Sequence, residues 1–321
     1  MSGFAYVVSR SGVRTIDPHD AIRLRRGFVW IHLTSRDEEV QAWLRDVAGL
    51  DRFVIDALTA LETRPRCDQT DGAAVLNLRG MTQGTMQRSD PLASVRLHAE
   101  GARVISVTRL PLDALTVTRA AMEAGDVRDA GDLITTLAEA ITEQLDPQVA
   151  DLGDSLDSCE EQLDARQAFE LRRKVNVVRR QAIGYRRFLY PQRVALEKLS
   201  TLPVRWLGED DRLHISGAAD RAARMAEELE SIRERAALIH ETLTDLRAEV
   251  IDQRSLVIAV AAMVFLPLTF ITGLFGMNVQ GIPYNDHPGS FWVITAFSLA
   301  VAAALTVYFV RRHWLRCGAR P

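Results

Sequence analysis

Residues 255–277 read SLVIAVAAMVFLPLTFITGLFGM, and residues 291–310 read FWVITAFSLAVAAALTVYFV. Neither run contains a charged residue, and each is long enough to cross a hydrocarbon core of about 30 Å as a helix. Two uncharged runs of this length, so close together, favour membrane-spanning helices over a pair of buried helices in a soluble core. We therefore predict transmembrane helices at 255–277 and 291–310.

Arginine placement predicts how these helices are oriented. The loop 278–290 contains no Lys or Arg, whereas the outer flanks of the two runs carry Arg254, Arg311, Arg312 and Arg316. Because Lys and Arg concentrate on the cytoplasmic side of a membrane, we expect a periplasmic loop and two cytoplasmic termini. The tail 311–321 is then a basic cytoplasmic segment, and the protein is expected in the inner membrane.

The charge of the chain excludes some classes of function. Residues 1–253 carry 41 acidic and 34 basic residues, whereas beyond them only Asp286 is acidic. The overall balance of 39 basic and 42 acidic residues argues against a dedicated nucleic-acid binder, which would be strongly basic. The three cysteines, Cys67, Cys159 and Cys317, are too far apart in sequence for a disulfide scaffold and suit a reducing compartment.

Residues 1–125 mix short β-rich runs with amphipathic helical patterns, which predicts a cytoplasmic α/β domain in a chain of α+β class. Asp71-Gly72 predicts a turn. Strands are expected at Phe4–Val8, Phe28–Leu33, Ala74–Leu78, Ser94–His98 and Arg103–Val107, and helices at Glu38–Ala48 and Phe53–Leu61.

Residues 126–254 have helical periodicity and are expected to form a helical stalk. Gly184, Pro191 and the stretch Leu202–Gly208 are expected to interrupt it. A long helix is predicted to begin near Asp210–Ser216 and to continue into the first span, because no Gly or Pro lies between residues 218 and 266. From residue 218 to 275 it would measure roughly 87 Å. A coiled coil is an alternative interpretation, and it is compatible with this one.

The first span ends in Phe275-Gly276-Met277-Asn278. A Gly-Met-Asn at the outer end of the first of two C-terminal spans resembles the signature of the CorA-type metal ion transporter superfamily. FLPLTFITGLFGMN at 265–278 and GIP at 281–283 are similar to the zinc-transport branch, ZntB. So are FVWIHL at 28–33 and ALETRPR at 60–66. The resemblance covers essentially the whole chain.

This resemblance implies a homopentameric funnel that transports divalent cations, with zinc preferred and the proton gradient as a driving force. It implies no enzymatic activity and no cofactor besides the transported ion. A separate argument also favours five subunits, because two spans cannot enclose a pore in one chain. Five helices about 10 Å wide leave a central radius of roughly 3.5 Å, and a hydrated divalent ion has a radius of roughly 3.5 Å.

Neither span contains Asp, Glu, His or Cys, so the pore offers no tetrahedral zinc ligands. We therefore expect a hydrated ion to pass. At the outer mouth, the Asn278 side chain and the carbonyls of Gly276 and Met277 would contact its water shell. Alternatively, Gly276 and Asn278 form only a helix C-cap, for which both residue types are favoured.

A stripe at helical spacing is expected to line the pore below the mouth. Thr269 could instead bond back to the carbonyl that Pro267 leaves free, Leu266 could face lipid, and Asp252 could pair with Arg254 or Arg247. The stripe comprises Gly273, Thr269, Leu266, Ala262, Ala259, Ser255 and Asp252.

Acidic residues outside the spans are weaker candidates. Asp286 and His287 in the loop could recruit cations to the outer entrance, and Glu241 and Asp245 could add acidic rings on the cytoplasmic side. For both pairs the alternative is an ordinary solvated surface.

Two other functions remain open at this point. One is a CorA-type channel for magnesium, or for cobalt or nickel, which the intact Gly-Met-Asn favours. The other is a membrane-anchored coiled-coil scaffold or signalling protein. The motifs GxxxxGK[ST] and GxGxxG are both absent, so ATP-driven transport is not expected.

Overall fold

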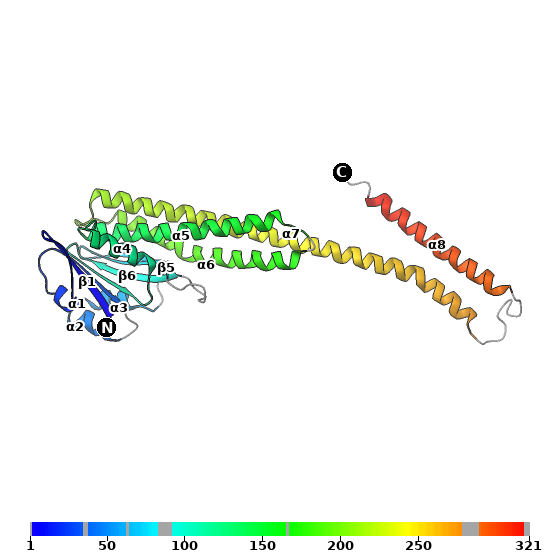
Figure 1. The fold of residues 1–321 in the computed structure, drawn as a ribbon, viewed down its shortest axis with the longest axis horizontal. Coiled ribbons are helices and arrows are strands. Elements are labelled where there is room, and N and C mark those ends of the chain that lie inside the picture. Colours follow the sequence, from blue (N-terminus) through cyan, green and yellow to red (C-terminus); the bar gives the residue numbers. More distant parts are fainter. Residues whose placement is uncertain are drawn as a thin grey trace. The chain divides into compact units, whose positions relative to one another are not determined.

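The fold is that of a computed structural model (Figure 1), in which residues 2–34, 38–61, 64–82, 92–164, 167–277 and 289–317 are described. The chain divides into two compact units by its internal contacts. The first comprises Met1–Leu163 with Phe169–His240, and the second Asp164–Ala168 with Glu241–Pro321.

The described part of the first unit contains a seven-stranded sheet, and all five predicted strands are confirmed. Its order is β2-β1-β3-β7-β6-β5-β4, with β3 and β7 parallel at the centre and every other neighbouring pair antiparallel. The strands are β1 (Ser2–Ser9), β2 (Gly12–Ile16), β3 (Phe28–Thr34), β4 (Arg66–Thr70), β5 (Ala73–Met81), β6 (Leu92–Ala99) and β7 (Arg103–Thr108).

The two strands that the sequence did not predict are the edges of this sheet. β2 reads GVRTI and has no buried residue, and β4 reads RCDQT, in which only Cys67 is buried. An edge strand that faces solvent needs no apolar alternation, so its sequence resembles a loop. The predicted turn at Asp71-Gly72 is confirmed, since it joins β4 to β5 and both residues have positive φ.

Helices α1 (Pro18–Ala21), α2 (Glu38–Asp46) and α3 (Arg52–Thr59) cover one face of the sheet. Trp43, Leu44 and Leu58 are almost fully buried in the core that they form with the sheet. Asp51 caps α3, because its carboxylate accepts a hydrogen bond of 2.8 Å from the Phe53 amide. Both predicted helices are confirmed, each ending two residues earlier than expected.

Helices α4 (Asp113–Ala124) and α5 (Ala130–Glu161) cover the opposite face. The approach of α5 to β5 is close, since a Cβ at Gly80 would lie 3.0 Å from the Ile141 side chain. Glycine at this position therefore lets the helix pack directly on the sheet.

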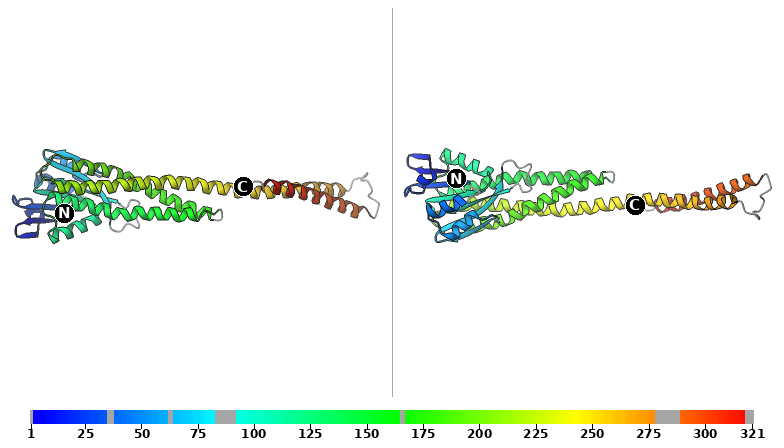
Figure 2. Two further views of the ribbon diagram at one scale, coloured as in Figure 1. Left: turned by 90° about the horizontal axis from the view of Figure 1, so that it is seen from above. Right: turned by 90° about the horizontal axis from the view of Figure 1, so that it is seen from below.

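Three long helices continue from the sheet: α5, α6 (Ala168–Ser200) and the first part of α7 (Glu209–Phe275). Figures 1 and 2 show them side by side. Ion pairs join them on the outside, with Arg235 2.5 Å from both Asp157 and Glu160, and Arg186 2.8 Å from Glu230. Apolar side chains are buried between them, including Leu152, Leu156, Val175, Val178, Leu229, Ile232, Ala236 and Ile239.

The sequence prediction of breaks at Gly184 and Pro191 is wrong, because α6 runs unbroken through both. Proline removes one backbone donor, but the buried side chains of Tyr185, Leu189 and Ala195 hold the helix in place on either side. Packing thus outweighs the local preference. The predicted interruption at Leu202–Gly208 is confirmed, since α7 begins at Glu209.

The second unit contains the last part of α7 and helix α8 (Ser290–Cys317). The prediction of one helix from the stalk into the first span is confirmed, since α7 has 67 residues. Both helices contain stretches long and apolar enough to cross a membrane.

We predict that Gly184→Ala stabilises the protein by roughly 0.5–1 kcal/mol, because alanine restricts the unfolded chain and favours the helix. Gly184 is exposed, and a Cβ there would meet no atom within 4 Å. Thermal unfolding of the detergent-solubilised chain, followed by circular dichroism, should show a higher midpoint. Gly153→Ala is the matched control. It makes the same change in helix α5, but at a position that is not open, because the new Cβ would touch Glu228 and Ile232 at 3.7–3.9 Å. A lower midpoint for Gly184→Ala would contradict a continuous, open helix at this position.

Candidate ion pathway

The candidate pore residues on α7 share one face of the helix. At 3.6 residues per turn they fall within an arc of about 120°. All of them are exposed in the single chain, so they are available to line a pore between subunits. They are Glu241, Asp245, Asp252, Ser255, Ala259, Ala262, Leu266, Thr269 and Gly273.

The apolar stretches of α7 and α8 are not core helices of this chain. In the most apolar window of α7 no residue is buried, and in that of α8 only 6% of residues are. Leu266, for example, is 68% exposed. A soluble core helix would be mostly buried, so these side chains need lipid or another subunit to cover them.

The carboxylates on this face have no partner within the described chain. No ion pair joins Asp252 to Arg247 or Arg254, and Glu241 and Asp245 form none either. Among the described residues no group of three or more His, Cys, Asp and Glu side chains could hold a metal ion. Any acidic ring around the pathway would therefore have to come from several subunits.

Two threonine hydroxyls bond back to backbone carbonyls of α7 close to Pro267. Thr269 Oγ1 donates to the carbonyl of Phe265 at 2.8 Å, and Thr272 Oγ1 donates to the carbonyl of Leu268 at 2.9 Å. The carbonyl that lacks its helical amide donor at Pro267 is that of Met263, four residues earlier. Thr269 therefore bonds back to the helix as predicted, but the prediction that it relieves the carbonyl freed by Pro267 is wrong, because its acceptor is the carbonyl of Phe265.

Gly276 lies directly beyond the end of α7. Its amide donates to the carbonyl of Thr272 at 2.9 Å, and a Cβ on Gly276 would lie only 3.0 Å from that same oxygen. Its φ is not in the left-handed region, so this glycine does not form a left-handed cap. Met277 is 49% exposed. Three predicted residues, Asn278, Asp286 and His287, lie outside the described residues.

The sheet histidines are structural. His32 is buried, with Nδ1 2.8 Å from Ser106 Oγ, and that hydroxyl also accepts a hydrogen bond from the Trp30 indole. Burial, with a smaller contribution from the Arg119 charge, lowers the pKa of His32 to about 3. Burial also lowers the pKa of His98, against the effect of Glu100. Both imidazoles are therefore neutral, and we assign neither to the ion pathway.

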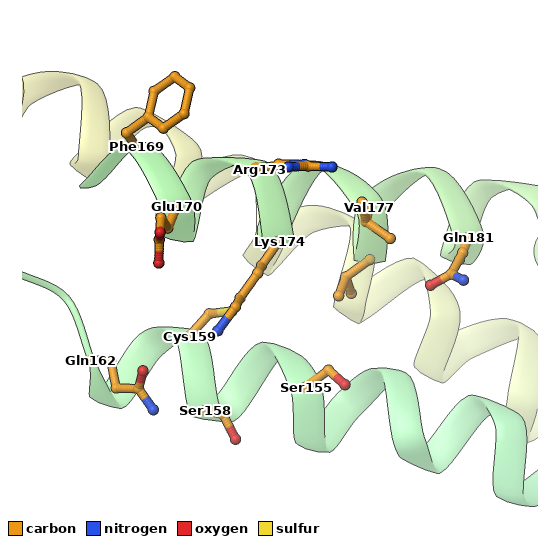
Figure 3. A pocket seen from close by; sticks show the side chains of 11 residues that line it. Ser155, Ser158, Cys159, Gln162, Phe169, Glu170, Arg173, Lys174, Val177 and Gln181 are labelled. Atoms are coloured by element: carbon orange, nitrogen blue, oxygen red, sulfur yellow. The ribbon is translucent and has the colours of Figure 1, made fainter. Parts of the chain in front are cut away.

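A cavity of about 670 Å³ lies between α5 and α6 (Figure 3). Lys174 reaches from α6 toward Cys159 on α5 (Figure 3). Burial raises the pKa of the Cys159 thiol, an effect that Lys174 partly opposes. The other charged side chains at this cavity are Glu170 and Arg173, so its lining has mixed charge and does not form a cation route.

A second cavity, rich in arginine, lies between β4 and α6 and was not predicted from the sequence. Its residues come from two segments far apart in the sequence, 64–68 and 186–198. The available signal was local, an Arg-Pro-Arg at 64–66 and an Arg-Arg at 186–187, and nothing in the sequence showed that the two meet.

Comparison with known proteins identifies relatives along nearly the whole chain. The family model described as CorA-like Mg2+ transporter protein matches residues 25–312. The divalent cation transporter CmaX of Pseudomonas aeruginosa is 33% identical over 290 residues, which is 89% of this chain and 87% of that protein. The zinc transport protein ZntB of Pectobacterium atrosepticum is 28% identical over 307 residues, 95% of this chain and 93% of that protein.

A solved structure shares the fold as well. The structure of full-length CmaX superimposes with a TM-score of 0.78 at 32% identity, covering 97% of this chain and 98% of that one. With a family model that spans most of the sequence, these matches show that this chain belongs to the CorA-like Mg2+ transporter family, whose members are transporters and not enzymes.

Proposed function

We propose that this chain transports divalent cations across the inner membrane as a homopentamer, with zinc as the preferred cargo. The main support is that this member of the family has two long uncharged stretches, one in α7 and one in α8, in which almost no residue is buried within the single chain. The relatives named CmaX and ZntB support a divalent cation, and the ZntB name supports zinc. The second candidate cargo is magnesium, which the description of the matching family favours.

In this proposal five copies of α7 surround the pore, with residues 255–277 as the first span and 291–310 as the second. Gly276, Met277 and Asn278 form the outer mouth and contact a hydrated ion. Leu266 forms an apolar constriction, and Asp252 contributes a ring of five carboxylates at the cytoplasmic end. Each carboxylate lacks an ion-pair partner among the described residues of its own chain.

Glu241 and Asp245 would form further acidic rings on the cytoplasmic side, since they lie on the same helical face as Asp252. Asp286 and His287 in the loop would raise the local cation concentration at the entrance. Membrane lipid covers the remaining apolar surface of both spans, and the chain needs no nucleic acid.

Uptake into proteoliposomes tests the proposal directly. Purified chain should carry Zn²⁺ faster than Mg²⁺ in separate runs, and an inward proton gradient should increase the rate. A metal-sensitive dye inside the liposomes provides the measurement, with empty liposomes as the control. Faster Mg²⁺ uptake would assign the magnesium function, whereas the absence of uptake for both ions would favour the scaffold function.

Asn278→Ala is expected to reduce uptake at least tenfold, because the mouth loses the amide oxygens that face the hydrated ion. Asn278→Gly separates this role from that of a helix cap, since glycine forms a left-handed cap at least as well. Loss of uptake in both variants supports ion contact, and an active glycine variant supports the cap. Both proteins should retain a mass near five times 35.8 kDa after detergent is subtracted.

Topology can be tested by labelling of introduced cysteines in intact cells. A membrane-impermeant maleimide should label Asn285→Cys and should not label Cys317, because the loop is periplasmic and the C-terminus cytoplasmic. Cys67 is a poor reporter of the cytoplasmic side, since the thiol is 3% exposed and burial raises its pKa to about 12. The exposed position of Ser11→Cys provides the matched cytoplasmic control. Labelling at position 317 from outside would reverse the proposed orientation.

A further inference from the structure

The arginine-rich cavity between β4 and α6 has a volume of about 640 Å³. One wall comes from the start of β4 and the residues before it, and the other from about the last four turns of α6. This volume lies within the range of pockets that hold small organic ligands. The cavity belongs to the first unit of the chain and has no part in the proposed ion pathway.

Positive charge dominates the lining. One carboxylate, Asp68, faces five cations: Arg64, Arg66, Arg186, Arg187 and Lys198. Asp68 is shared between Arg66 at 3.4 Å and Lys198 at 3.6 Å, and Arg186 pairs with Glu230 at 2.8 Å. Arg64 and Arg187 form no ion pair with any described residue. Among the residues that the structure describes, two carboxylates thus oppose five cations, and the guanidinium groups of Arg64 and Arg187 are available to an anion.

The sheet behind this wall adds further positive charge. Arg66 on β4 is opposite Asn77 on β5, which is opposite Arg96 on β6, so the three side chains project from the same face. Arg96 is only 3% exposed, and its Nε has no hydrogen-bond partner among the described residues, nor does Asn77 Oδ1. Burial and the charges of Arg109, Arg79 and Arg66 lower the pKa of Arg96 to about 10.

Buried cations are normally paired, but Arg96 is surrounded by the further positive charges of Arg109, Arg79 and Arg66. An anion in the adjacent cavity would relieve that repulsion. Guanidinium groups bind phosphate oxygens in a bidentate manner, so Arg64 and Arg187 are suited to phosphate groups. Tyr190 lines the same cavity and is 56% exposed, which leaves its ring open to stack on a planar ligand.

From these observations we infer that the cavity between β4 and α6 binds a nucleoside polyphosphate, with the phosphates against Arg64 and Arg187 and the base against Tyr190. The bound nucleotide is not an energy source, since the chain lacks the GxxxxGK[ST] and GxGxxG motifs. The cavity between α5 and α6 is a weaker site for this ligand, because Glu170 offsets its cations.

Equilibrium dialysis of radiolabelled ATP against the full-length chain in detergent tests the inference. EDTA is present throughout, so that the transported metals neither bind ATP nor occupy the pore. We expect saturable binding of one ATP per chain and competition by pyrophosphate. Arg64→Gln and Arg187→Gln should each raise the Kd at least tenfold, as expected for a lost hydrogen bond to a charged group.

Arg193→Gln is the matched control. It removes one positive charge from the same helix, but Arg193 pairs with Glu197 at 2.7 Å and does not line the cavity. Its Kd should stay within twofold of the parent value. Tyr190→Leu should weaken ATP binding and leave pyrophosphate binding unchanged. Circular dichroism and assembly mass show whether each variant is folded.

Three results would overturn the inference. The first is the absence of saturable ATP binding up to millimolar concentration, which includes the case of a cavity covered by a neighbouring subunit. The second is an equal change in the Kd of ATP for Arg187→Gln and Arg193→Gln. The third is ATP binding that Tyr190→Leu does not change, which would exclude the nucleoside. None of these readouts depends on transport, so they leave the proposed function untouched.

Discussion

The backbone of α7 has to keep its hydrogen bonds in two solvents. In hydrocarbon no water satisfies an amide or a carbonyl, so a single chain segment can cross only as a helix. The helix Glu209–Phe275 meets this constraint because its backbone stays helical throughout, and only the kind of side chain differs between its two parts. Up to Leu243 one side of the helix is apolar and buried while charged groups lie on the other sides, and from Ser255 onward no side of the helix carries a charge. At Pro267 the hydroxyls of Thr269 and Thr272 add hydrogen bonds within the same turns.

The apolar contacts between α5, α6 and α7 account for more of the stability than the ion pairs around them. Arg235, Asp157 and Glu160 are 40–54% exposed, and ion pairs that water reaches contribute about 0–1 kcal/mol each. Leu229 and Ile232 are almost fully buried, and complete burial of such a side chain contributes about 1.5–3 kcal/mol. The charges therefore serve mainly to set which faces of the helices meet.

Sequence patterns predicted the features that depend on local periodicity. The central strands were predicted correctly because they are short β-rich runs, and the continuous helix α7 because no Gly or Pro interrupts residues 218–266. Edge strands β2 and β4 were missed because neither needs a buried face, and Gly184 and Pro191 were taken as breaks because local preference ignores packing. The spacing of Asp252 and Thr269 also predicted that both lie on the same face of helix α7. The arginine-rich cavity was missed because it forms only when residues 64–68 meet residues 186–198. The ion contacts of Asn278 stay a prediction.

The composition of the spans limits how zinc can be preferred. With no Asp, Glu, His or Cys in either span, the proposed pore offers only neutral oxygens, and in our proposal these contact the water shell of a hydrated ion. Such contacts hardly distinguish two hydrated ions of the same charge and similar size. Zinc and magnesium differ when water is replaced, because zinc accepts imidazole and carboxylate readily whereas magnesium loses water reluctantly. A strong preference for zinc therefore requires direct contact with a residue that flanks the spans, such as Asp252 or His287. A weak preference is what a purely hydrated pathway predicts.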